Sequence, residues 1–199
     1  MAWFRLTNNA GVPVNAALSW ADFNEFKAND IAPRHTDANG NPQSGYAEWD
    51  VGGAAWHSLT AVVSNGKNQF GSNNAEAISE WVIGSLGVIG TAAGIILIPF
   101  TGGLSTAMTA AGAAALATAV GGAVVTVADV VFAGVEFALK PVTIGNLYAP
   151  HGYNFTFSGG DVVYKQDEND PNKIIVTGFT PLTVGWHNNE TGSHGTVTE

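Results

Sequence analysis

The sequence predicts an α+β fold, an antiparallel β-sandwich that carries an inserted, apolar α-helical hairpin. Two observations lead to this prediction. Residues 81–128 contain no Asp, Glu, Lys, Arg or His, whereas the chain on either side alternates between apolar and polar residues over short stretches. Alternation with a period of two is typical of strands with one buried face. A helix without charge on any face must be enclosed by protein or by lipid.

The first half of the sandwich is expected within residues 1–72. Alternation predicts strands at 2–8, 14–20, 46–51 and 55–63. The dipeptide Asn65-Gly66 is a strong two-residue hairpin signal, and it leads into a further short strand. Between these strands, residues 21–45 are expected to form mainly a polar loop, beginning with either a helical turn or an edge strand.

The insertion is placed at residues 73–140. Asn73 with Glu76 resembles a capping box at its start, and Pro141 follows its end. Two helices are expected, at 81–98 and 106–128, joined by a turn rich in Pro, Gly and Ser. The first would rise about 27 Å, close to the hydrocarbon thickness of a bilayer. The residues expected to enter a membrane are Trp81, Val82, Ile83, Leu86, Val88, Ile89, Ile95, Ile96, Leu97 and Ile98.

A face of small residues is expected to bring the two helices together. Such faces let helix backbones approach closely. The residues assigned to it are Gly87, Gly90, Gly94, Ala107, Ala111, Ala114, Thr118 and Gly122.

After the insertion, alternation returns and predicts the second half of the sandwich at residues 141–187. Strands are expected at 142–148, 153–158, 161–166, 173–179 and 182–187. Residues 188–199 are assigned to a tail. Many short strands divided by turn residues are typical of a sandwich, so both halves should form one body.

The stretch RLTNNAGVPVNAALSWADFNEF, residues 5–26, resembles the opening of the small β-sandwich proteins named for up-regulation in an insulin-signalling mutant. In that family an Ala/Gly-rich helical segment also lies between two β portions. The family's biochemical role is poorly defined, so the resemblance implies architecture rather than activity. The overall plan is also similar to pore-forming toxins that sheath a hydrophobic helical hairpin, although no toxin motif matches and no functional residue can be carried over.

Composition and motifs argue against an enzyme. The sequence has no Cys, which removes thiol nucleophiles and Cys-ligated metal, and its five His show no metal-binding spacing. It also lacks a nucleophile elbow and a phosphate-binding loop. We therefore expect no catalytic residue, no metal and no cofactor. The net charge of -9 argues against nucleic acid as a partner.

Two aromatic–histidine pairs are candidate contacts to a lipid headgroup or a glycan. They are Trp56-His57 and Trp186-His187, each within a predicted strand. Because strand residues alternate between faces, one member of each pair should point outward. The other member is then expected to lie in the core.

These features predict a membrane-permeabilising protein. It would bury the apolar hairpin in its soluble form, insert it into a target bilayer and form a homo-oligomer. Because residues 1–15 do not resemble a signal peptide, release without one is expected, with membrane association in the active form. The alternative is a non-enzymatic binding or stress-response sandwich in which the hairpin is a structural core.

Overall fold

The computed structural model describes residues 2–21, 23–37, 39, 41–64, 69–71, 81–83, 89–90, 129–132, 137–166, 168–169 and 173–199. Every secondary-structure element assigned within these residues is a β-strand. The predicted α+β class is therefore wrong, because the described part of the chain is all-β.

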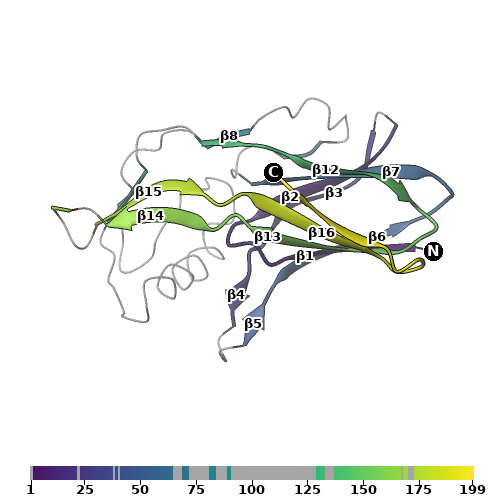
Figure 1. The fold of residues 1–199 in the computed structure, drawn as a ribbon, viewed down its shortest axis with the longest axis horizontal. Helices are drawn as coiled ribbons and strands as arrows, with labels where there is room; N and C mark the ends of the chain where they lie inside the picture. Colours follow the sequence, from purple (N-terminus) through teal and green to yellow (C-terminus); the bar gives the residue numbers. More distant parts are fainter. Residues whose placement is uncertain are drawn as a thin grey trace.

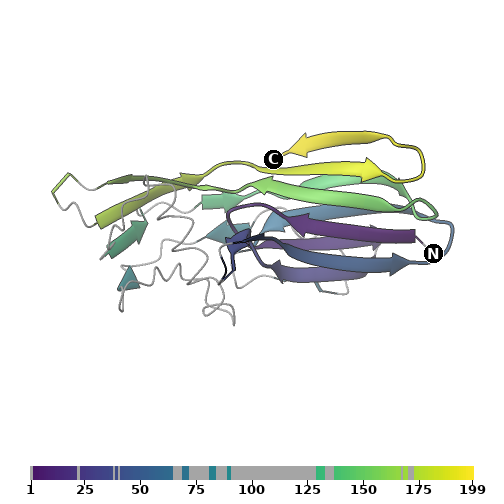
Figure 2. The same ribbon diagram turned by 90° about the horizontal axis from the view of Figure 1, so that it is seen from below.

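Two sheets form the main body, and they lie face to face (Figures 1 and 2). In spatial order, the five-stranded sheet contains β17 (His194–Thr198), β16 (Leu182–Asn188), β13 (Tyr153–Gly159), β1 (Ala2–Asn8) and β6 (Gly45–Val51). The four-stranded sheet contains β12 (Val142–Tyr148), β7 (Trp56–Val63), β2 (Val14–Trp20) and β3 (Phe23–Ile31). Within these two sheets, neighbouring strands run antiparallel except β1 and β13, which are parallel, so the sandwich is mixed rather than purely antiparallel.

Smaller sheets extend this body. One contains, in order, β14 (Val162–Gln166), β15 (Lys173–Phe179), β10 (Asp129–Phe132) and β9 (Ile89–Gly90). The pair β8 (Trp81–Ile83) and β11 (Phe137–Leu139) forms a second, and β4 (His35–Thr36) with β5 (Pro42–Gln43) a third. In Figure 1, β14 and β15 reach beyond β13 and β16, away from the N-terminus.

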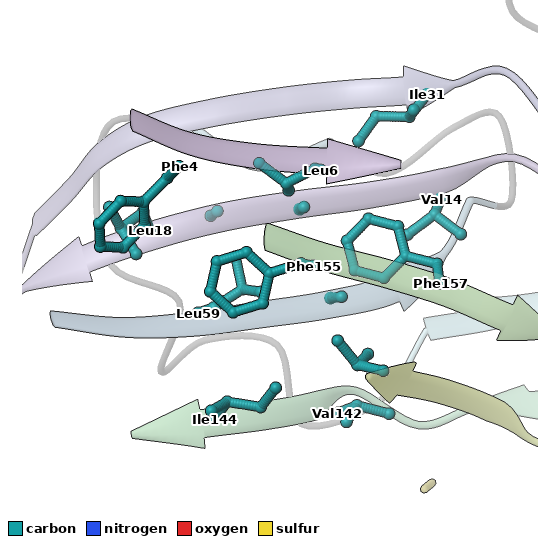
Figure 3. Close-up of a cluster of buried hydrophobic side chains, with 14 of the residues drawn as sticks. Phe4, Leu6, Val14, Leu18, Ile31, Leu59, Val142, Ile144, Phe155 and Phe157 are labelled. Carbon is teal, nitrogen blue, oxygen red and sulfur yellow. The ribbon is translucent and has the colours of Figure 1, made fainter. Parts of the chain in front are cut away.

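The core lies between the two main sheets (Figure 3). The five-stranded sheet contributes alternate residues of β1 and β13, among them Phe4, Phe155 and Phe157, which are fully or almost fully buried. The four-stranded sheet contributes Leu18 and Leu59, which are buried to the same extent. Each such side chain stabilises the fold by roughly 1.5–3 kcal/mol relative to exposure. Burial of alternate residues therefore accounts for the strand signal in the sequence.

Most predicted strands are confirmed, four of them with matching ends: β1, β2, β12 and β15. Strand β3 instead occupies residues that were expected to form a helical turn or edge strand followed by a loop. Its pairing with β2 shifts register twice, and such irregularities break the period of two on which the prediction relied. The residues expected as a C-terminal tail include β17, which pairs with β16. The predicted hairpin turn at Asn65-Gly66 lies outside the described residues.

The predicted helical hairpin is contradicted where the structure describes it. Residues Trp81–Ile83 and Ile89–Gly90 are strands, and each is paired antiparallel with a strand from the end of the insertion. An apolar run has no period that separates a buried strand from a buried helix, so the partner strand decides. Gly90 therefore belongs to a strand and not to a helix-packing face. The other predicted hairpin residues lie outside the described residues: Leu86, Gly87, Val88, Gly94, Ile95, Ile96, Leu97, Ile98, Ala107, Ala111, Ala114, Thr118 and Gly122.

Candidate functional site

The four-stranded sheet has two ends with different chemistry. At one end Ala61 of β7 pairs with Val142 of β12, and beyond this pair the chain enters and leaves the insertion. At the other end Trp56 pairs with Tyr148, beside the turns that lead into β7 and out of β12. We call the first the insert end, which includes the strands β8, β9, β10, β11, β14 and β15. We call the second the aromatic end, which includes Trp56, Tyr148 and His151.

An exposed aromatic surface marks the aromatic end. The Trp56 side chain is 62% exposed, and its ring centroid lies 4.9 Å from that of Tyr148. The Tyr148 ring in turn meets His151 edge to face, with centroids 5.3 Å apart and planes at 90°. Trp20 and Phe23 flank the β2–β3 turn at this same end and are also more than half exposed. An exposed Trp side chain packed beside a Tyr ring is typical of a binding surface.

Hydrogen bonds fix the orientation of His151. The Asn188 side chain is buried, and its Oδ1 accepts the backbone N–H groups of Glu190 and Thr191 at 3.0 and 3.1 Å. Its Nδ2 must therefore be the donor group that lies 3.0 Å from Nδ1 of His151 and 3.1 Å from the Tyr153 hydroxyl. An amide nitrogen accepts no hydrogen bond, so Nδ1 of His151 is the acceptor. A neutral His151 consequently carries its proton on Nε2.

The two predicted aromatic–histidine pairs divide as alternation requires, one residue outward and one inward. In the first pair Trp56 is outward, whereas His57 is 2% exposed, with Nε2 2.8 Å from a Glu25 carboxylate oxygen. In the second pair His187 is exposed, and its Nδ1 lies 3.1 Å from the Asn189 side-chain oxygen. Trp186 packs against the core under Gly195, whose added Cβ would lie 2.8 Å from the indole nitrogen. His57 is thus buried and Trp186 partly buried, and contact of either residue with a headgroup or glycan stays a prediction.

The pairs are linked across the aromatic end by residues that the sequence did not single out. Trp56 touches Tyr148, Tyr148 touches His151, and His151 is bonded to Asn188, the residue after His187. The sequence did hold one indication of Tyr148 and His151. The stretch Tyr-Ala-Pro-His, residues 148–151, begins at the end of a predicted strand and so marks a turn there. Only the pairing of β7 with β12 across the insertion could place this turn beside Trp56.

At the insert end the chain forms two successive antiparallel strand pairs, β8 with β11 and β9 with β10. Val82 pairs with Ala138, and further along Ile89 pairs with Val130. Of the residues predicted to enter a membrane, Trp81, Val82, Ile83 and Ile89 lie in these strands. Their entry into a bilayer stays a prediction. No helix within the described residues is long and apolar enough to cross a membrane.

The described residues hold no group of three or more His, Asp or Glu placed to bind a metal ion. No family model, curated protein or solved structure matches the chain. The function must therefore be inferred from the arrangement of the two ends.

Proposed function

We propose that the protein acts on membranes, and that the uncharged residues between β9 and β10 bind and permeabilise a lipid bilayer. The observation that supports the proposal combines sequence and position. Residues 91–128 carry no charge, and they begin and end at the paired positions Gly90 and Asp129. A charged side chain at the bilayer centre costs about 2.5–3.5 kcal/mol on insertion scales, so its absence over such a length favours contact with lipid.

The pairing of β9 with β10 brings the two residues that flank this segment together. From the sandwich outward, β7 pairs with β12, β8 with β11 and β9 with β10, each time joining the two sides of the insertion. Directly opposed residues of an antiparallel pair have Cα atoms about 4.5–5.5 Å apart. The segment can therefore be presented to a bilayer as one unit while the sandwich stays intact.

Contact with lipid is proposed to be apolar rather than electrostatic. The net charge of -9 disfavours attraction to anionic headgroups. The protein would meet the bilayer from water and associate with it in the active form. Because one segment of this length lines no pore by itself, permeabilisation is proposed to involve several copies of the chain.

A second candidate function is that of a non-enzymatic binding protein. The exposed Trp56 and the half-buried Tyr148 beside it favour it, since they lie at the end of the sandwich opposite to the insertion. In that case the apolar segment would serve only as part of the protein's own core.

Dye release from phosphatidylcholine vesicles tests the first proposal against the second. The variant is a chain in which residues 91–128 are replaced by Asn-Gly, because two residues in a type I′ turn can join paired antiparallel positions. We expect the full chain to release dye and the shortened chain to release none. Thermal unfolding and the near-UV circular dichroism of the shortened chain show whether its sandwich still folds.

A point substitution provides the matched control. Leu97→Glu should reduce release at least tenfold, because it adds a carboxylate to the segment, whereas Leu97→Met should leave release within about twofold. Equal release by the full-length and shortened chains, or none from vesicles of any composition tried, would contradict the proposal.

A further inference from the structure

We propose that the aromatic end is a binding site for a neutral glycan, with Trp56 and Tyr148 as the stacking surface and His151 as a hydrogen-bond donor. Two described features support it. Trp56 is 62% exposed, and its ring lies beside that of Tyr148 at a centroid distance of 4.9 Å. His151 lies next to this surface and has a fixed proton position. This site is independent of the membrane proposal, because it lies at the other end of β7 and β12.

The donor is set in place before any ligand arrives. Asn188 uses its oxygen for two backbone N–H groups and its nitrogen for His151 and Tyr153. The Tyr153 hydroxyl also accepts the backbone N–H of Tyr148 at 3.1 Å, which ties the stacking residue to the same network. His151 therefore presents Nε2–H beside the aromatic surface. A ligand gains affinity from such a site because little ordering is needed on binding.

A pyranose ring matches both groups. One face of many pyranoses consists of C–H bonds, whose slight positive charge is attracted to the negative face of an aromatic ring. The ring hydroxyl groups lie around the edge of the sugar, where their oxygens can accept the His151 Nε2–H. A sugar stacked on the aromatic rings could therefore also accept the hydrogen bond from His151 Nε2–H.

The charges around the site favour a neutral ligand. In the described part of the chain, the ring contacts and side-chain hydrogen bonds of Trp56, Tyr148 and His151 are made with aromatic, amide and imidazole groups. Neither Lys nor Arg takes part in these contacts, so the described contacts supply no fixed positive charge to an anionic ligand. The net charge of -9 adds a long-range penalty for anions.

Binding of the full chain to a panel of immobilised neutral oligosaccharides tests the site. The panel contains chains that end in galactose, glucose, mannose or N-acetylglucosamine. We expect at least one to bind, and Trp56→Ala, Tyr148→Ala and His151→Ala each to weaken binding about tenfold or more. Tyr46→Ala is the matched control, since Tyr46 is 73% exposed on β6 of the other sheet and should leave affinity within about twofold.

Asn188→Asp tests the positioning of His151. The carboxylate still accepts hydrogen bonds from the two backbone N–H groups, but toward His151 it can only accept a hydrogen bond, from Nδ1–H, where the amide donated one to Nδ1. The neutral ring should then change tautomer, which ¹⁵N NMR of the imidazole detects directly. We expect glycan affinity to fall about tenfold with the Trp56–Tyr148 surface still folded.

Several outcomes would overturn this assignment. Binding of no neutral glycan at millimolar concentration is one, and binding that survives both Tyr148→Ala and His151→Ala is another. Phosphatidylcholine vesicles serve as a second probe: capture of vesicles that Tyr148→Ala abolishes, with no glycan bound, would assign the site to a lipid headgroup instead. Dye release is measured separately, so failure of either proposal leaves the other standing.

Discussion

The two ends of the sandwich are built in different ways. At the insert end the described contacts are backbone pairs, from β8 with β11 to β9 with β10, and they carry a segment defined by its lack of charge. At the aromatic end named side-chain atoms matter, since the proton on His151 depends on one amide of Asn188. A property spread over many residues should tolerate conservative substitutions. A site that depends on a few atoms should respond to single ones.

The largest difference in stability is expected between two glycines of positive φ, one near each end. Gly159 ends β13 just before the β14–β15 extension, with φ of 76°, and an added Cβ would lie 2.1 Å from the Pro181 carbonyl oxygen. Gly159→Ala should lower the free energy of unfolding by roughly 2–5 kcal/mol, since backbone strain and a backbone clash combine. Urea unfolding monitored by fluorescence measures this change.

Gly53, in the turn before β7, is the matched position. Its φ is 82°, but an added Cβ would meet nothing within 4 Å. Gly53→Ala should therefore cost about 1–2 kcal/mol from conformation alone. Equal losses for the two variants would mean that the junction at Gly159 is no tighter than an open turn.

A smaller effect is expected at His57, which lies behind the aromatic end. Its side chain is 1% exposed, and Nε2 donates to Glu25 at 2.8 Å, while Nδ1 has no partner among the described residues. Glu25→Ala should lower the free energy of unfolding by about 1–3 kcal/mol, because a buried donor loses its acceptor. Glu25→Gln keeps an oxygen there and should cost about 1 kcal/mol or less. Urea unfolding compares the two variants, and equal losses would show that the hydrogen bond contributes nothing.

The sequence predicted the aromatic end better than the insert end for a physical reason. Strands such as β1 and β13 have one face in the core and one in water, so Phe4 and Phe155 alternate with exposed residues and the period of two is visible. From Trp81 to Gly90 every residue is apolar or small, and no period distinguishes a strand from a helix. Length then favoured a helix, and the described pairs show strands.

The binding surface itself was only half predictable. Alternation predicted that one member of each aromatic–histidine pair points outward, because it needs nothing beyond the strand that holds the pair, and the structure identifies Trp56 and His187 as these members. Tyr148 and His151 follow the insertion, and their position beside Trp56 depends on the pairing of β7 with β12. The tautomer of His151 depends on Asn188 and on the turn that follows β16. The sequence alone does not show that this turn lies beside His151.

The smallest effect is expected on the outer face of the five-stranded sheet, where Arg5 and Glu48 form an ion pair at 3.0 Å with side chains 58% and 30% exposed. Exposed pairs of this kind contribute about 0–1 kcal/mol and are screened by salt. Glu48→Gln should therefore change the free energy of unfolding by about 0.5 kcal/mol or less, and less still in 1 M NaCl. Glycan affinity and dye release should both be unchanged, because this pair belongs to neither end. A change above twofold in glycan affinity would extend the binding surface from the aromatic end onto this sheet, since Arg5 pairs with Asn154, whose amide donates to Asn189 beside His187.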